Sequence, residues 1–265
     1  MSAKPLPPLW SRRVNHDVGL LIIGTEILSG RREDRHFPRS RQQLTRYGYG
    51  VAWCLIVPDT RDILRAQLRW AMSQATPFFS FGGLGATPDD LTRDCAAWAA
   101  GIALSRHPEA EALIRRQFGD GAEPVRIRMA DLPAGSTLIP NPVNNVPGFS
   151  VGNGHFFPGF PHMAEPMSDW VLAQYFPPRQ ADLEARILLP NAREGDLVPL
   201  MESFCAAHPD IRFSSLPSFK ANGPQIELGV AGRAVAVQSA MADLQERLRE
   251  MGYAVSELAD PGSIG

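Results

Sequence analysis

The chain alternates between unbroken apolar runs and stretches in which apolar residues recur with helical spacing. The early apolar runs are Val18–Ile23, Val51–Val57 and Phe78–Phe81. The stretches with helical spacing cover about residues 33–47, 60–72 and 88–100, and Asp59 or Thr60 is placed to cap the second of them. Strands without a polar face are typical of a parallel sheet that is covered on both sides. The alternation therefore predicts a mostly parallel sheet between two layers of helices.

After this first region the pattern is less regular. Residues 107–118 have helical spacing, and residues 126–151 are rich in Pro, Gly and Asn, which predicts loops and short strands. A strand end and turn follow at 156–161, then a helix at 163–175. The segment Phe176-Pro177-Pro178-Arg179-Gln180 has the composition of a linker.

A second pattern of elements begins at Ala181. Strands are expected at 183–189, 211–216, 225–230 and 253–256, and helices at 194–207 and 235–251. The order β-α-β-β-α-β is that of a small α+β sandwich of the ferredoxin type. We therefore predict a flexible tail at 1–17, an α/β domain at 18–176 and a small α+β domain at 181–258.

Composition narrows the classes of function. The 265 residues include 44% hydrophobic and 20% charged residues, as in a globular protein with a real core. The net charge of −2 gives no electrostatic reason to expect nucleic acid or a membrane as partner. No run of about 18 apolar residues and no signal-peptide core occur. The odd, scattered cysteines Cys54, Cys95 and Cys205 suit a reducing compartment, so we expect a cytoplasmic protein.

The segment Gly82-Gly83-Leu84-Gly85-Ala86-Thr87-Pro88-Asp89-Asp90 follows an apolar strand directly. Its glycines let a ligand approach the main chain. Thr87 and Pro88 suit the N-cap and first position of a helix, and Asp90 is spaced to close a capping box with Thr87. The free N–H groups at such a helix start favour a phosphate.

Asp89 and Asp90 would repel a phosphate placed beside them, and two interpretations stay open. Either a divalent cation such as Mg²⁺ bridges carboxylate and phosphate, or both acids only cap the helix. The first strand ends in a similar way, with Gly24-Thr25-Glu26 and then Ser29-Gly30. If the two strand ends are neighbours, Glu26 and Asp90 share one cleft.

Several of these segments together resemble a known family. They are GTEILSG at 24–30, GGLGATPDDLTR at 82–93, Pro147-Gly148-Phe149 and Pro158-Gly159-Phe160-Pro161. They are similar to the molybdopterin-binding domain of the MoaB/Mog type, and most closely to its version in CinA-type competence/damage-inducible proteins. The second half, including Leu216-Pro217-Ser218-Phe219, resembles the KH-like domain of CinA proteins.

The resemblance implies a three-layer α/β/α fold, a homo-oligomer (dimer or trimer) and one of two functions. Relatives either bind a pterin phosphate, as in molybdopterin handling, or hydrolyse the pyrophosphate of ADP-ribose with a divalent metal. It implies catalysis by Asp90 and Asp89, with Asp90 and Glu26 as metal ligands. It places ligand binding at Gly24, Thr25, Glu26, Ser29, Gly82, Gly83, Leu84, Gly85, Thr87, Pro158 and Gly159.

The chain also departs from the family pattern. Thr25 stands where the family has Asp, His36 where it has Asn, Asn144 where it has Gly, and Met163 where it has Glu. A threonine hydroxyl can hydrogen-bond a phosphate, but it does not supply the charge of an aspartate. We therefore keep three hypotheses: a metal-dependent hydrolase of a nucleotide pyrophosphate, a pterin- or nucleotide-binding protein with impaired catalysis, and a structural or partner-binding protein that keeps the fold without the site.

Other polar residues are weighed against simpler roles. His36, His155 and His162 are expected to be packed or surface residues, with His36 the best candidate for a site. The arginines at 31, 32, 35, 39 and 41 are expected to form a solvated helix face, from which one or two could reach a phosphate. Ala221-Asn222-Gly223-Pro224 lacks the Gly-x-x-Gly loop of KH domains, so nucleic acid is not an expected partner.

Overall fold

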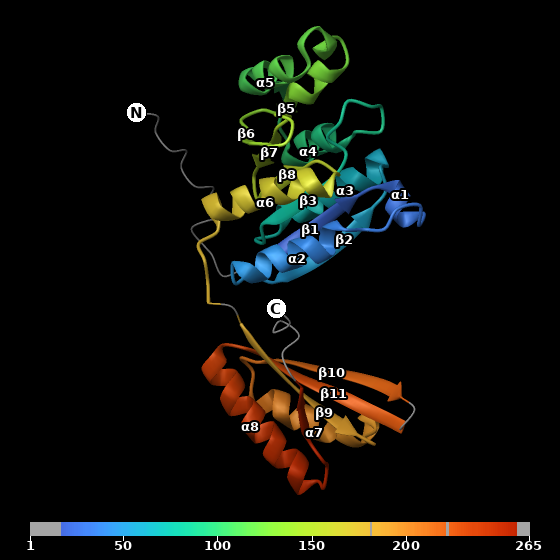
Figure 1. The fold of residues 1–265 in the computed structure, drawn as a ribbon, viewed down its shortest axis with the longest axis vertical. Coiled ribbons are helices and arrows are strands. Elements are labelled where there is room, and N and C mark those ends of the chain that lie inside the picture. Colours follow the sequence, from blue (N-terminus) through green and yellow to red (C-terminus); the bar gives the residue numbers. More distant parts are fainter. Residues whose placement is uncertain (1–16, 181, 221–222, 259–265) are drawn as a thin grey trace. The chain divides into compact units, whose positions relative to one another are not determined.

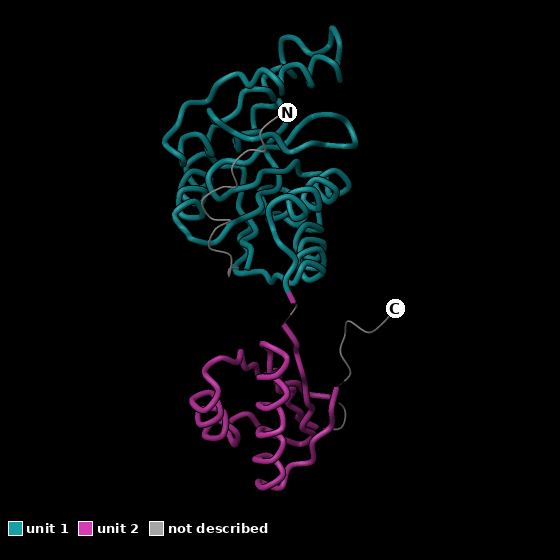
Figure 2. Tube along the Cα trace, turned by 90° about the vertical axis from the view of Figure 1, so that its left-hand side faces the viewer, with its two compact units in different colours: residues 1–179 teal, residues 180–265 magenta. Residues whose placement is uncertain are grey.

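The structure is a computed structural model that describes residues 17–180, 182–220 and 223–258. The chain forms two compact units, which divide between Arg179 and Gln180 (Figure 2). The predicted tail at 1–17 lies outside the described residues except for Asp17. The Asp17 carboxylate accepts a hydrogen bond of 2.9 Å from the backbone N–H of Gly50.

The first unit is built on a six-stranded sheet with strand order β2-β1-β3-β8-β7-β6 (Figure 1). The strands are β1 (Val18–Ile23), β2 (Val51–Val57), β3 (Phe78–Phe81), β6 (Thr137–Ile139), β7 (Gly148–Val151) and β8 (Gly154–Phe157). Strands β2, β1, β3 and β8 are parallel, whereas β7 and β6 are antiparallel to their neighbours. The prediction of a mostly parallel sheet is confirmed.

Alternate residues of each strand enter two separate cores. Leu21 and Phe78 face a core made with helices α3 (Arg61–Ser73) and α4 (Thr92–Ala100). Leu20 and Phe79 face a second core, made with α2 (His36–Arg46) and α6 (Pro161–Tyr175). Each fully buried Leu or Phe contributes roughly 1.5–3 kcal/mol of hydrophobic free energy. The continuous apolar runs are therefore explained by a sheet covered on both faces, and the three-layer fold is confirmed.

A smaller subregion interrupts the sheet between β3 and β6. It contains α5 (Pro108–Phe118), two 3₁₀ helices, η2 (Gly119–Ala122) and η3 (Arg126–Ala130), and a two-stranded sheet of β4 (Leu104–Arg106) and β5 (Asp131–Pro133). The predicted helix at 107–118 begins one residue later. His107 is its N-cap, and the His107 ring accepts a hydrogen bond from the backbone N–H of Ala110.

The predicted helix start at Pro88 is wrong. Helix α4 begins at Thr92, after a turn that spans residues 87–90. The Thr92 N–H donates to the Gly83 carbonyl, and the Thr92 hydroxyl donates to the Gly82 carbonyl. These bonds fix the helix entry against the end of β3. Thr87 is therefore not the N-cap, although its predicted pairing with Asp90 is present.

Part of the predicted linker packs on the first unit. Phe176 is buried, and the Tyr49 hydroxyl donates a hydrogen bond of 2.8 Å to the Pro177 carbonyl. The Arg179 N–H donates to the Tyr47 carbonyl, 3.0 Å away. The segment up to Arg179 is thus fixed to the α/β unit by its own backbone.

The second unit has the predicted order β-α-β-β-α-β. Its antiparallel sheet has the order β10-β11-β9-β12 (Figure 1). The sheet and two helices share a core, to which the helices contribute Phe204 and Leu244. The elements are β9 (Leu183–Pro190), α7 (Glu194–Ala207), β10 (Arg212–Lys220), β11 (Gly223–Gly232), α8 (Ala234–Glu250) and β12 (Ser256–Leu258). The closing strand thus begins at Ser256 and not at Tyr253. Residues 221–222 of the predicted KH-like turn lie outside the described residues.

In the part of the chain that the structure describes, no helix has the length and apolarity needed to cross a bilayer.

One buried histidine makes the stability of the first unit depend on pH. His155 of β8 is fully buried, 2.7 Å from the Ser150 hydroxyl and stacked on Tyr175. Burial lowers the pKa of His155 to about 3. The unfolded chain, with an ordinary pKa near 6.5, binds the proton more readily. Stability is therefore complete above about pH 6.5 and is lost as the pH falls from there towards 3.

Replacing His155 by glutamine should flatten this pH dependence. Protonation of His155 in the unfolded chain should lower the free energy of unfolding of the wild type by about 2 kcal/mol between pH 7 and pH 5. H155Q should not show this decrease. All five tryptophans precede Gln180, so tryptophan fluorescence during denaturation reports on the first unit alone. The exposed His162 provides the control H162Q, which should keep the wild-type slope. Equal slopes for wild type and H155Q would contradict the prediction.

Candidate functional site

Two glycines, Gly82 and Gly159, bring three strand ends into contact at one edge of the sheet. Gly82 follows β3, and its N–H donates 3.0 Å to the carbonyl of Phe157 at the end of β8. A Cβ at Gly82 would lie 2.4 Å from the Ile23 carbonyl of β1, and its φ of +107° also excludes most other residues. A Cβ at Gly159 would lie 3.3 Å from the Gly82 Cα. The ends of β1 and β3 are therefore neighbours, as predicted.

Asp90 closes the glycine-rich turn from within. Its Oδ1 accepts a hydrogen bond of 2.8 Å from the Gly85 N–H, and its Oδ2 accepts one of 2.9 Å from the Thr87 N–H. The Thr87 hydroxyl lies 2.5 Å from the same Oδ2. A Cβ at Gly85 would lie only 2.4 Å from that oxygen. Both carboxylate oxygens are therefore used to shape the loop.

Asp89 is in a different position. Its carboxylate is exposed, and its Oδ1 lies 2.6 Å from the Thr87 hydroxyl. This hydrogen bond lowers the pKa of Asp89. The single hydroxyl proton of Thr87 serves either Asp89 or Asp90 at one time. Asp89 is therefore an accessory partner of the turn, whereas Asp90 holds the backbone.

The loop leaves backbone donors unused. Within the described residues, the N–H groups of Gly83, Leu84 and Ala86 have no protein acceptor. Gly83 lies at the start of α4, because its carbonyl accepts the Thr92 N–H, and a helix carries its positive dipole end there. Arg93 lies against the loop, 92% buried, and donates 2.8 Å to the Leu84 carbonyl. Successive free N–H groups of this kind form a concavity that suits an anion.

The loop that follows β1 is hydrogen-bonded to the residues that follow β2. After Gly24 the chain forms one helical turn, α1 (Thr25–Leu28), which was not predicted. The N–H and hydroxyl of Thr25 both donate to Asp59 Oδ2, at 2.8 and 3.1 Å, and the Asp59 N–H donates to the Thr25 hydroxyl. Thr25 therefore acts here as a structural link. The sequence predicts Asp59 only as a helix cap. An acid soon after a strand end, as at Glu26, is the sequence signal that could have identified it as part of this loop.

Ser29 is also occupied locally. Its hydroxyl donates 3.2 Å to the Glu26 carbonyl and accepts from Arg31, which closes the turn after α1. The prediction that Ser29 contacts a ligand stays a prediction, and in the structure the residue serves α1.

A pocket of about 400 Å³ opens between α1, the start of α2 and the turn that joins β8 to α6. The side chains around it are mainly charged and aromatic, and they come from three separate segments. They belong to Ile23, Glu26, Ile27, Arg32, Glu33, Arg35, His36, Arg39, Gly159, Phe160, Pro161 and His162. Of the predicted site residues, Glu26 and Gly159 line this pocket. Gly82 to Asp90 form the neighbouring loop, which touches the pocket wall where Gly82 meets Gly159, and Pro158 precedes that contact.

Arginines give the pocket its charge. Arg32 lies 3.8 Å from Glu26, and Arg39 lies 2.8 Å from Glu165. Arg35 has no carboxylate within 4 Å among the described residues. The arginines were expected to form a solvated helix face. In the structure three of the five, Arg32, Arg35 and Arg39, line one pocket.

His36 forms part of the pocket floor. It is buried, stacks on Phe81 at 4.6 Å, and its Nε2 lies 3.3 Å from the Gly159 carbonyl. Burial lowers the pKa of His36, and the hydrogen bond to Gly159 opposes this shift. The His36 ring therefore connects α2 to the β8–α6 turn. It is both packed against Phe81 and part of the pocket lining.

Glu26 and Asp90, the predicted metal ligands, are each turned towards their own loop. The Glu26 carboxylate folds back over Gly24, since a Cβ there would lie 2.9 Å from a Glu26 oxygen. Asp90 turns its oxygens into its own loop. Among the described residues, no three His, Cys, Asp or Glu side chains converge as a metal site would require. A metal held by Glu26 and Asp90 therefore stays a prediction.

The fold and the glycine-rich edge define the class of protein. The family model described as "Probable molybdopterin binding domain" matches residues 19–178, and the chain belongs to this family. The resemblance inferred from the sequence is confirmed.

Relatives extend the similarity beyond this domain. A protein of Aeropyrum pernix is 30% identical over 256 residues, which cover 92% of this chain and 95% of the relative. A CinA-like protein of Anaeromyxobacter dehalogenans is 36% identical over 163 residues, covering 58% of this chain but 40% of its own length. The crystal structure of CinA from Thermoplasma acidophilum matches 60% of this chain and 97% of its own, with 30% identity and a TM-score of 0.55.

Asp90 and Asp89 should differ sharply in their effect on stability. D90N places an amide N–H₂ against loop N–H groups and should cost roughly 1–3 kcal/mol of unfolding free energy. D89N, at the exposed acid, should leave the denaturation midpoint unchanged. Urea unfolding followed by tryptophan fluorescence measures both. Equal effects of the two variants would show that Asp90 does not hold the loop.

Proposed function

We propose that the first unit binds a small molecule that carries a phosphate and a planar ring, of the pterin or nucleotide type. The observation that supports this most is that, among the described residues, the N–H groups of Gly83, Leu84 and Ala86 have no protein acceptor and Arg35, in the neighbouring pocket, has no carboxylate within 4 Å. Membership of the molybdopterin-binding family favours a pterin.

In this proposal the two halves of the site share the ligand. The loop N–H groups and the start of α4 receive the phosphate, because fixed donors need no rearrangement to bind an anion. Arg35 adds a charged, two-pronged contact. Phe160, which is 54% exposed on the pocket wall, offers an apolar face to a planar ring.

The free cysteines support a cytoplasmic setting as part of the same proposal.

Isothermal titration with a pterin monophosphate and with ADP tests this proposal. R35Q should weaken binding about tenfold or more, because the pocket loses its uncommitted charge. Arg41 lies on α2, which Arg35 precedes as the N-cap residue, and it is outside the pocket lining, so R41Q is the control and should bind as the wild type does. Lack of binding by the wild type would reject the proposal, and equal losses in both variants would reject the role of Arg35.

A second candidate is metal-dependent hydrolysis of a nucleotide pyrophosphate such as ADP-ribose. The observation that favours it is Glu26, a half-exposed carboxylate in the pocket, together with the similarity to a CinA-like protein. The engagement of Asp90 within its loop and the absence of Asp at position 25 count against it. We therefore rank binding above hydrolysis.

Incubation with ADP-ribose and Mg²⁺, Mn²⁺ or Co²⁺ separates the two functions. Hydrolysis requires AMP release that E26Q abolishes while ADP binding persists. The ranking above predicts ADP binding without AMP release in every metal. Turnover by the wild type that E26Q removes would reverse the ranking.

A further inference from the structure

Arg93 places a buried positive charge beside the glycine-rich loop. It is the second residue of α4, and it is only 8% exposed. Its guanidinium donates a hydrogen bond of 2.8 Å to the Leu84 carbonyl. In the first turn of a helix, a cation is repelled by the positive end of the helix dipole. Arg93 therefore lies where a positive charge is costly unless an anion is close to it.

The two acids that act on the charge of Arg93 are committed to other groups. Burial lowers the pKa of Arg93, and the charges of Asp90 and Asp131 oppose this shift, so the guanidinium stays charged at neutral pH. Among the described residues, neither carboxylate lies within 4 Å of it. Asp131 is paired with Arg106, 2.6 Å away, and Asp90 binds the loop N–H groups. A buried guanidinium without a close carboxylate costs free energy that a bound anion would recover.

Three successive loop carbonyls point towards the start of α4. Those of Gly82 and Gly83 accept hydrogen bonds from Thr92. That of Leu84 accepts the one from Arg93. The N–H of a trans peptide points away from its carbonyl, so the N–H groups of Gly83 and Leu84 face away from Thr92. An anion can therefore bind both N–H groups without breaking any bond that holds the loop.

Arg93 and Asp90 lie on opposite sides of one peptide group. The carbonyl of the Leu84–Gly85 peptide accepts from Arg93, and its N–H donates to Asp90. The two charges are thus separated by little more than this peptide group. Because water is largely excluded from Arg93, their attraction is only weakly screened.

A phosphate at this loop meets the negative charge of Asp90, and a nearby cation must offset that repulsion. A divalent ion would do so from solution. Arg93 is already fixed in place for the same task. We propose that Arg93 is the cation of the phosphate site: its buried charge offsets Asp90, so that a phosphate binds the loop without a divalent metal. This inference rests on the proposed function and adds to it the residue that decides whether binding needs metal.

Titration of the full chain with pterin monophosphate and with ADP, first in EDTA and then with Mg²⁺, tests the proposal. The wild type should bind at least as tightly in EDTA as with Mg²⁺, because Arg93 supplies the positive charge. Binding that EDTA abolishes would overturn this inference and leave the proposed function standing. No binding in either condition would reject the proposed function and this inference with it.

Removal of the charge at position 93 should create a need for metal. R93M should bind about tenfold more weakly in EDTA, and Mg²⁺ should reduce that loss. R93K keeps the charge and should stay close to the wild type in EDTA. If R93M binds as the wild type does, or if its loss is unchanged by Mg²⁺ and shared by R93K, Arg93 acts only through its contact with Leu84 and the proposal fails.

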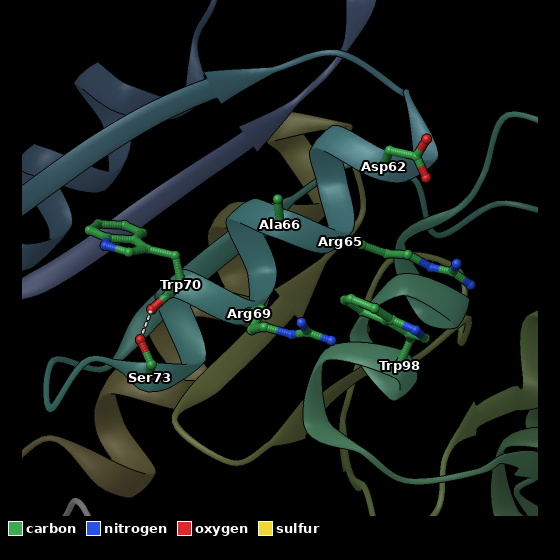
Figure 3. Close-up of a pocket in the computed structure, with 7 residues that line it drawn as sticks. All are labelled: Asp62, Arg65, Ala66, Arg69, Trp70, Ser73 and Trp98. Atoms are coloured by element: carbon green, nitrogen blue, oxygen red, sulfur yellow. Dashed lines mark hydrogen bonds between the residues drawn. The ribbon is translucent and has the colours of Figure 1, made fainter.

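Arg69 of α3 provides a matched control. Like Arg93, it has no carboxylate within 4 Å among the described residues, but it is exposed. It lies 3.8 Å from the centre of the Trp98 ring, beside a cavity of about 570 Å³ whose lining includes no residue of the loop (Figure 3). R69M should bind as the wild type does in both conditions. Equal losses in R69M and R93M would attribute the effect to overall charge and overturn the proposal.

Urea denaturation followed by tryptophan fluorescence checks that R93M is folded. Its midpoint should stay near that of the wild type, because an apolar side chain replaces a buried charge. Should R93M fail to fold, R93K and the comparison of the wild type in EDTA and Mg²⁺ still decide the proposal.

Discussion

The close approach of three strand ends at Gly82 is the constraint on which the rest of the site depends. Parallel strands β1, β3 and β8 must end side by side, and the Gly82 Cα lies against the Ile23 carbonyl on one side and Gly159 on the other. Any Cβ at Gly82 would push the strands apart. The glycine thus allows one edge of the sheet to collect the loop, α1 and the β8–α6 turn, which explains why binding groups gather there.

Asp90 converts this edge into a defined loop. Asp90 binds the N–H groups of Gly85 and Thr87, and the N–H groups of Gly83, Leu84 and Ala86 have no acceptor among the residues that the structure describes. Asp90, an acid of the kind that holds metals, thus shapes the loop in this structure, and the proposed anion site rests on the backbone N–H groups. Thr25 has a parallel role, because its bonds with Asp59 secure α1 where the family has an additional acid. Both observations favour binding over hydrolysis.

The pocket is lined by α1, the start of α2 and the β8–α6 turn, whereas the exposed side of α3 lies beside β2 and α4. The sheet connects these two surfaces, since β1 carries both Ile23 at the pocket and Gly19 beneath Trp53.

The order of strands and helices, both domain patterns and the glycine-rich turn could be predicted from the sequence, because apolar periodicity and glycine spacing are local properties. The GGLGATPDDLTR segment was specific enough to indicate the family as well. The sequence could not show that Asp90 faces inward, that α4 starts at Thr92, or that Arg32, Arg35 and Arg39 share one pocket. Side-chain direction and long-range proximity depend on how strand ends and helices pack, and only the tertiary structure determines that packing.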